Sequence, residues 1–243
     1  MMKNRKAAFT LAEVLITLGI IGVVAAMTLP TLIQSYQKQV WATSAKKSYA
    51  VISNMLQKMM ADEGASSITD TTLFTDGLCS TSSSCEDAYG NPSVLKNTIP
   101  KYLKVVKICK GSECNMKYNN AEIVDSKFKP SSYKYNISGF FSNVSGNSIY
   151  GFYTNDGQIY YITFNGWVDE NDRSVKFCFD TNGEKGPNTR GRDFFCAEYC
   201  KNGRIPLYSA YAGCMHTDEE LAQFGVPQYL FIHLMNNGWK MDY

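Results

Sequence analysis

Side chains that could bind a cation gather in the segment 180–193, which also contains three glycines and one proline. The oxygen-bearing members are Asp180, Asn182, Glu184, Asn188 and Asp193. Calcium binds about six to eight oxygens from carboxylates, amides and backbone carbonyls, so this spacing predicts a calcium site. The segment differs from an EF-hand loop because its twelfth position is Gly191 instead of a glutamate. The alternative is a turn without metal, in which Asp and Asn bond to the local backbone and glycine adopts positive φ.

Eight cysteines form the second group with a defined chemistry, and all of them follow residue 78. This number indicates an oxidising compartment and a framework of disulfides. Cys79 and Cys85 flank a short Ser/Thr loop, and Cys109 and Cys114 flank another short loop. Each of these two pairs is therefore predicted to form a local disulfide.

The pairing of the remaining four cysteines depends on the segment 180–193. If that segment is the turn of a hairpin, Cys178 lies opposite Cys196, which leaves Cys200 to pair with Cys214. Zinc binding is the alternative, but the closely spaced cysteines do not follow the common C-x2-C pattern of zinc sites.

No constellation of residues predicts catalysis. The two histidines are His216, beside a run of polar and acidic residues, and His233, within an apolar run. The sequence contains no nucleophile elbow, zinc-protease or phosphate-loop motif. A net charge of +2 gives no reason to expect a nucleic-acid partner. We therefore expect a protein that is not an enzyme and requires no cofactor, with calcium as its candidate ligand.

The elements that would position these residues are mainly strands. Alternating apolar and polar residues, with aromatic and β-branched side chains, predict strands at 102–109, 121–128, 147–154, 158–164, 174–179 and 193–199. The tripeptide Asn155-Asp156-Gly157 predicts a tight turn that joins two of them in a hairpin. The segment 62–93 is rich in Ser and Thr and is predicted to be a loop-rich connector rather than core.

The amino terminus has a different composition. Lys3, Arg5 and Lys6 precede a segment, 9–33, whose single charged residue is Glu13. As a helix this segment would be about 37 Å long, enough to cross a bilayer core of about 30 Å. The positive leader predicts that the amino terminus stays in the cytoplasm while the rest of the chain lies outside. Two simple alternatives are an uncleaved signal anchor and a secretory signal that is cut after Ala26.

The run Ala8-Phe9-Thr10-Leu11-Ala12-Glu13, followed by Val14-Leu15-Ile16, resembles the prepilin signal of type IV pilins and type II secretion pseudopilins. In that family a membrane-embedded peptidase cuts before the Phe and methylates the new amine, which implies a cut between Ala8 and Phe9. This sequence has Ala8 where the family usually has Gly. Glu13 and Pro30 become the fifth and twenty-second mature residues, positions that the family favours. The turn at 180–194 and the tail at 237–243 also resemble pilin-like proteins, more weakly.

Glu13 and Pro30 are expected to serve assembly. A lone carboxylate in an apolar helix needs a partner, and the amine of Phe9 in a neighbouring subunit can supply it and set the register of a filament. The alternative is that Glu13 snorkels or pairs within its own chain. Pro30 removes the backbone hydrogen bond to Ala26 and is expected to kink or loosen the helix.

After the apolar segment the pattern is that of an amphipathic helix that ends near Gly64. Its expected packing stripe contains Tyr36, Val40, Ser44, Ser48, Val51, Ile52, Met55 and Met59. The predicted organisation is a leader at 1–8, a long helix at 9–60 that spans the membrane at about 9–33, and a globular head at 61–243. The predicted fold is α+β and pilin-like, with the helix packed on an antiparallel sheet whose loops are tied by disulfides.

These features predict a prepilin-like structural subunit, a minor pilin or pseudopilin of a type IV filament or type II secretion pseudopilus. The resemblance implies as partners the prepilin peptidase, other pilin or pseudopilin subunits, the assembly platform and the bacterial inner membrane. It implies a single-pass protein with its head outside the cytoplasm, and then a periplasmic or cell-surface filament. The alternative is a membrane-anchored extracytoplasmic binding protein that does not polymerise.

Overall fold

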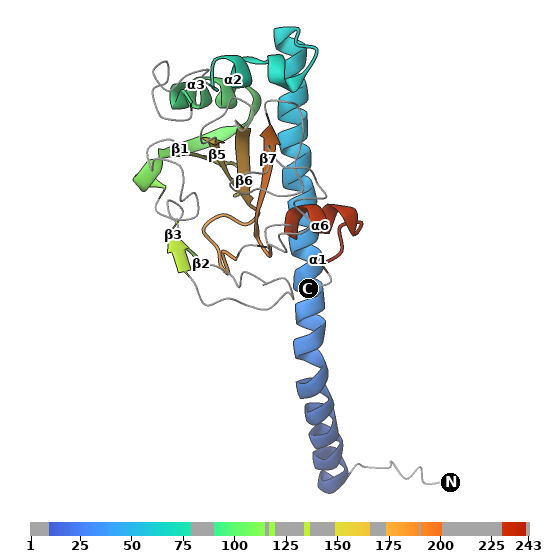
Figure 1. The fold of residues 1–243 in the computed structure, drawn as a ribbon. Helices are drawn as coiled ribbons and strands as arrows, with labels where there is room; N and C mark the ends of the chain where they lie inside the picture. Colours follow the sequence, from blue (N-terminus) through green and yellow to red (C-terminus); the bar gives the residue numbers. More distant parts are fainter. Residues whose placement is uncertain are drawn as a thin grey trace, which may run out of the picture. The chain divides into compact units, whose positions relative to one another are not determined.

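The computed structural model describes residues 10–78, 90–114, 117–119, 134–136, 149–165, 174–189, 191–200 and 230–241. The chain divides into two compact units, Met1–Val40 and Trp41–Tyr243. The first helix, α1 (Leu11–Glu63), contributes to both units (Figure 1). The head unit therefore includes the last part of this helix.

Helix α1 is continuous, with Pro30 inside it. It includes an eighteen-residue window with a mean hydropathy of 2.2, and by length and composition it could cross a membrane. Pro30 cannot donate a backbone hydrogen bond. On either side of it, the hydroxyl groups of Thr28 and Thr31 donate to backbone carbonyls one turn earlier, at 2.9 and 2.8 Å. Helix α1 therefore continues through Pro30 from Leu11 to Glu63.

The carboxyl end of α1 is closed by a Schellman motif, which agrees with the expected end near Gly64. Gly64 adopts a φ of +65°. The N–H of Ala65 donates to the carbonyl of Met60 at 2.9 Å, and the N–H of Gly64 donates to the carbonyl of Ala61 at 3.4 Å. These bonds satisfy two of the carbonyls that every helix end leaves without a partner.

One face of the last part of α1 packs in the head. Its buried residues are Ala42, Ala45, Ser48, Ile52, Met55, Leu56 and Met59. The expected stripe is right from Ser44 onward, where its residues are buried or half-buried, but wrong before it, because Tyr36 and Val40 are 66% and 42% exposed. The packed face begins at Ala42, next to the start of the head unit at Trp41.

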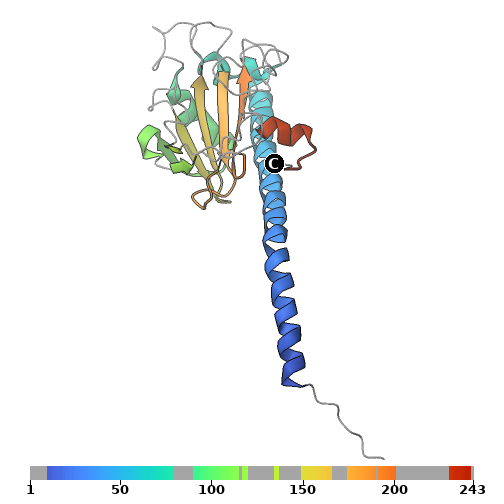
Figure 2. The same ribbon diagram turned by 60° about the horizontal axis from the view of Figure 1, so that its bottom comes forward.

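The head is built on an antiparallel five-stranded sheet in the order β1-β4-β5-β6-β7 (Figure 2). Its strands are β1 (Val105–Lys110), β4 (Tyr150–Thr154), β5 (Ile159–Asn165), β6 (Ser174–Asp180) and β7 (Phe194–Cys200). The predicted β4–β5 hairpin is confirmed, and Gly157 in its turn has a φ of +82°, which favours glycine. Strands β2 (Lys117–Asn119) and β3 (Lys134–Asn136) form a separate pair. The strand expected at 121–128 lies outside the described residues.

The segment after α1 contains short helices that the sequence analysis did not predict. They are η1 (Ile68–Asp70), α2 (Thr72–Thr75) and α3 (Pro92–Tyr102), and η3 (Gly111–Glu113) follows β1. The prediction that this segment stays out of the core is wrong, because Leu73 and Phe74 of α2 are 0% and 2% exposed. Strand β1 begins at Val105 rather than at Tyr102, because Tyr102 still belongs to α3.

The sheet separates two apolar clusters. Val175, Phe177 and Phe179 of β6 belong to the larger cluster, which also contains the buried residues of α1. Cys178, between them in the sequence, belongs to a smaller cluster with Cys109 and Tyr161. Alternate residues of a strand point to opposite faces of its sheet, so the two clusters lie on its two faces.

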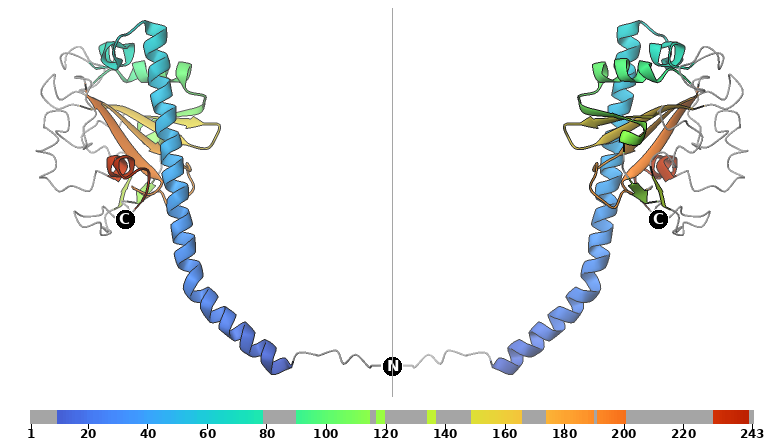
Figure 3. Two further views of the ribbon diagram at one scale, coloured as in Figure 1. Left: turned by 90° about the vertical axis from the view of Figure 1, so that its right-hand side faces the viewer. Right: turned by 90° about the vertical axis from the view of Figure 1, so that its left-hand side faces the viewer.

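The last described helix, α6 (Leu230–Asn236), adds to the larger cluster (Figure 3). Its Phe231 ring contacts Tyr49 of α1 and Phe179 of β6, with centroids 5.6 and 5.2 Å apart. Trp239 follows α6 and contacts both Tyr49 and Phe231. Aromatic side chains therefore pack the last part of the described chain, α6 and Trp239, against α1 at the start of the head.

Candidate assembly site

Glu13 and Thr10 form a capping box at the amino end of α1. The N–H and the hydroxyl of Thr10 donate to Oε2 of Glu13, at 2.9 and 2.8 Å. In return, the N–H of Glu13 donates to the hydroxyl of Thr10 at 3.3 Å. Thr10 is the N-cap and Glu13 the third helical residue, so the two side chains satisfy each other's backbone N–H groups. In the single chain, Glu13 is thus bonded to its own helix.

The helix that follows exposes its apolar side chains in the single chain. Large apolar residues from Leu11 to Ile33 are 43% to 80% exposed. No heavy atom would lie within 4 Å of a Cβ added at Gly19 or Gly22, leaving aside the helix's own neighbouring backbone. An apolar surface of this extent needs lipid or other helices to cover it. The one charged group among these residues, Glu13, lies within one turn of the start of α1.

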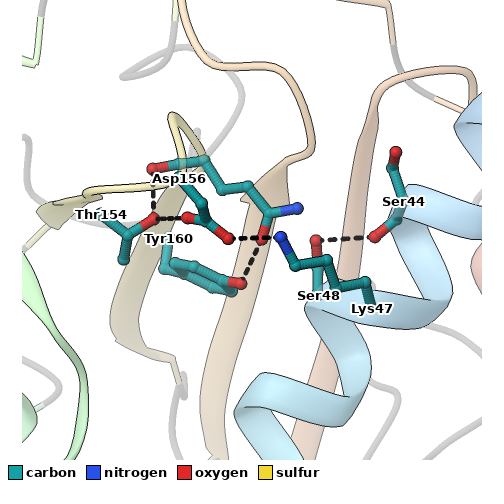
Figure 4. A network of polar contacts seen from close by, with 7 residues as sticks. Ser44, Lys47, Ser48, Thr154, Asp156 and Tyr160 are labelled. Carbon is teal, nitrogen blue, oxygen red and sulfur yellow. Dashed lines mark hydrogen bonds and ion pairs between the residues drawn. The ribbon is translucent and has the colours of Figure 1, made fainter.

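A polar network fixes α1 to the β4–β5 hairpin in the head (Figure 4). Nζ of Lys47 donates to Oδ2 of Asp156 at 2.6 Å, and the hydroxyl of Thr154 donates to Oδ1 at 2.6 Å. Burial acts to raise the pKa of Asp156, but these bonds and the charge of Lys47 hold it below its ordinary value. The buried hydroxyl of Tyr160 donates to Oε1 of Gln158 at 2.6 Å, and burial raises its pKa.

Among the predicted cation ligands, Asp180 ends β6 and Asp193 directly precedes β7, and their carboxylates accept from the local backbone. Oδ1 of Asp180 accepts from the N–H of Asn182 at 3.0 Å. The carboxylate of Asp193 accepts from the N–H groups of Asn188, at 2.8 Å, and Thr189. The side-chain oxygen of Asn182, by contrast, is buried without a hydrogen-bond partner among the described residues.

Other residues of the turn also bond to the local backbone or adopt turn conformations. The amide of Asn188 is placed to donate to the carbonyls of Lys185 and Gly183, at 2.8 and 3.3 Å. Gly183 and Gly191 have φ values of +67° and +79°. Glu184 is exposed. Among the described residues, no group of three or more His, Cys, Asp or Glu side chains is arranged to hold a metal ion.

Two of the disulfides expected from the sequence are present among the described residues. Cys109 is joined to Cys114 and Cys178 to Cys196, and the second pair lies in register across β6 and β7. Cys200 is also disulfide-bonded. Cys79, Cys85 and Cys214 lie outside the described residues, as do the processing residues Ala8 and Phe9, His216 and the side chain of His233.

Two contacts of the structure were not predicted from the sequence, the Thr10–Glu13 capping box and the Lys47–Asp156 pair. The capping box had a readable signal, because a Thr followed three residues later by Glu before an apolar run is typical of a helix start. The Lys47–Asp156 pair had none, since nothing in a single sequence relates an exposed lysine on a helix to an aspartate in a distant turn.

The long helix and the antiparallel head with its disulfides define a pilin-like α+β protein. Residues 3–29 match the model of the prokaryotic N-terminal methylation motif. This match supports the type IV pilin and pseudopilin-like family and a pilin-like precursor. No curated protein and no solved structure matches the chain.

Proposed function

We propose that the chain is the precursor of a filament subunit, a minor pilin or pseudopilin of a type IV filament or type II secretion pseudopilus. A prepilin peptidase cuts between Ala8 and Phe9 and methylates the new amine. The mature chain then assembles with other pilin or pseudopilin subunits on the assembly platform. The methylation motif at 3–29 supports this processing. The four expected disulfides and a head larger than a minimal pilin's favour a minor subunit.

The observation that carries the proposal is the position of Glu13 in an exposed apolar helix. A carboxylate at the centre of a bilayer costs about 3 kcal/mol or more. Glu13 lies in the first turn of α1, where this cost is smaller, but its charge still favours a bonded partner. In the single chain that partner is Thr10. Cleavage before Phe9 creates a positive amine, and a carboxylate bonds more strongly to a charged amine than to a neutral donor. Glu13 therefore exchanges Thr10 for the amine of a neighbouring subunit, which sets the stagger between helices.

The same segment supports a single-pass topology. Lys3, Arg5 and Lys6 precede the apolar stretch, and positive residues favour the cytoplasmic side. The head then lies outside the cytoplasm of a bacterial inner membrane, first anchored and later in a periplasmic or cell-surface filament. The disulfides of the head agree with an oxidising compartment. The proposal assigns the protein no catalytic step and no required cofactor, and the turn at 180–193 acts as a self-capped turn.

Mass spectrometry of the mature amino terminus tests the proposal. The chain is expressed in cells with a prepilin peptidase and in matched cells that lack it. We expect N-methylated Phe9 as the first residue in the former and the intact leader in the latter. A terminus at Met1 in both strains would favour an anchored protein that does not polymerise. A terminus at Met27 would show cleavage as a secretory signal.

A further inference from the structure

A cavity of about 260 Å³ opens in the head between three segments that are distant in the sequence. Helix α1 contributes Met55 and Lys58, the link from α3 to β1 contributes Leu103 and Lys104, and β5 contributes Tyr160. Sites for drug-sized ligands have volumes of roughly 300–1,000 Å³. A cavity just below that range fits one compact molecule or one unit of a polymeric ligand.

The lining of the cavity combines apolar surface with fixed hydroxyl groups. Met55, Leu103 and Tyr160 are 2%, 7% and 2% exposed, so these side chains form a closely packed floor of the cavity. The hydroxyl of Tyr160 is held by Gln158, and that of Thr154 by Asp156. Each hydroxyl donates its proton within the protein, and the Tyr160 hydroxyl also bonds to Ser48. Thr154 is therefore the hydroxyl that keeps acceptor capacity for a ligand.

Two lysines place positive charge at the rim of the cavity, while the carboxylates of Asp62 and Glu63 act on the neighbouring Tyr102. Lys58 and Lys104 are exposed, and within the described part of the chain neither forms an ion pair. Asp156 is the one carboxylate of the lining, and Lys47 pairs with it at 2.6 Å. Asp62 lies one turn beyond Lys58 on α1 but does not come within ion-pair distance of it. Two amines thus remain available to an anion.

Two amides complete the rim, Asn54 on α1 and Asn155 in the β4–β5 turn. An amide both donates and accepts, which suits it to ligand hydroxyl groups. A bare phosphate would use the lysines but leave the apolar lining and the amides without contacts. A neutral sugar would leave the lysines without a partner. A compact anion that carries hydroxyl groups uses all of them.

We propose that this cavity binds a sugar acid of the hexuronic class, with Lys58 and Lys104 holding its carboxylate and Asn54 and Asn155 its hydroxyl groups. The ligand is a free sugar acid or one unit of an acidic polysaccharide. This binding activity goes beyond filament assembly and does not depend on it, because every contributing residue belongs to the head unit.

Titration calorimetry on the full-length mature protein in detergent tests the assignment. The probes are galacturonate, galactose as its neutral counterpart, inorganic phosphate, a Glu-Glu dipeptide and polygalacturonate. Galacturonate is expected to bind about tenfold or more tightly than galactose, because its carboxylate adds charge-assisted bonds to the lysines. A comparison of galacturonate with polygalacturonate then identifies the source, and tight binding of either one supports the site.

The double variant Lys58→Gln/Lys104→Gln is expected to weaken galacturonate binding by about tenfold or more and to leave the weak binding of galactose unchanged. Lys101→Gln, which removes an exposed lysine of α3 outside the cavity lining, is the matched control and is expected to bind like the wild type. Circular dichroism and thermal unfolding confirm that each variant is folded.

Several results would overturn the assignment. Binding of galactose as tightly as galacturonate would exclude a role for the lysines. Phosphate or the dipeptide displacing galacturonate with equal affinity would reduce the cavity to a general anion or acidic-peptide site. If the folded double variant bound galacturonate with wild-type affinity, or if the wild type bound no uronate, the cavity would not be a sugar-acid site.

Discussion

Lys47 of α1 and Asp156 of the β4–β5 turn meet at 2.6 Å between Nζ and Oδ2, although 109 residues separate them in the sequence. The contact joins the helix to the hairpin at the point where the sheet turns, beside the buried Ser48 and Tyr160. It positions the hairpin on α1 rather than supplying much energy, because the lysine and aspartate side chains are 57% and 34% exposed.

Removing this pair should lower the free energy of unfolding only slightly, and only at pH values where Asp156 is ionised. Lys47→Gln is expected to lower the free energy of unfolding by about 0.2–1 kcal/mol at neutral pH, as for other solvent-exposed pairs. A carboxyl whose pKa is lowered by folding stabilises the protein above its unfolded pKa, and this contribution is lost as the pH falls through the lowered pKa. The difference between variant and wild type should therefore vanish in strong acid.

Thermal unfolding over a range of pH measures this effect, with Lys96→Gln as a control at an exposed lysine of α3. In a double-mutant cycle, Asp156→Asn should add little to Lys47→Gln. A stability difference between Lys47→Gln and wild type that stays constant down to strong acid would contradict the assignment.

The turn at 180–193 should be stable without calcium. Its buried Asp193 carboxylate accepts two backbone N–H groups, so Asp193→Asn is expected to destabilise the head by about 1–3 kcal/mol by setting an amide N–H against them. Glu184→Gln, at an exposed position, should be neutral. Chelator should leave the unfolding temperature of the wild type unchanged. A rise in that temperature with added calcium, abolished in Glu184→Gln, would instead establish a metal site.

The cap at Thr10 should order the start of α1. Thr10→Val removes the hydroxyl that accepts from Glu13 N–H and donates to its carboxylate, at a cost of about 0.5–2 kcal/mol to the helix end. Hydrogen exchange of the amides of Glu13 and Val14, which bond to the hydroxyl and the carbonyl of Thr10, should accelerate in detergent micelles in Thr10→Val and stay slow in Thr10→Ser. Equal exchange in Thr10→Val and the wild type would mean that the cap has no role.

Periodicity and turn chemistry predicted much of the head. Alternation along 174–179 and the turn residues after Asp180 were enough to place Cys178 opposite Cys196, and Gly157 marked the hairpin turn. Helix α3 was missed because Pro92, Pro100 and the neighbouring Ser and Thr suggest loop. In the structure Pro92 occupies the first turn, where its missing N–H costs nothing, and Leu95 and Ile99 bury one face.

The start of the packed face of α1 could not be found from the helix alone. Val40 and Ala42 are two positions apart and point to nearly opposite sides of the helix, and the first is exposed while the second is buried. The apolar pattern alone does not say which of these sides packs, because that depends on strands far along the chain. The capping box, by contrast, is local and can be recognised from its residues.

The central claim is that Glu13 pairs with the amine of a neighbouring subunit during assembly. Its most direct test is filament formation by Glu13→Gln in cells that carry no other copy of the gene, with processing of the variant followed by mass spectrometry. Glu184→Gln serves as the matched control, since it removes one exposed carboxylate from the head. We expect Glu13→Gln to be cleaved before Phe9 but to remain in the membrane without entering filaments, while the control assembles normally. Filaments of Glu13→Gln at the wild-type level would contradict the account.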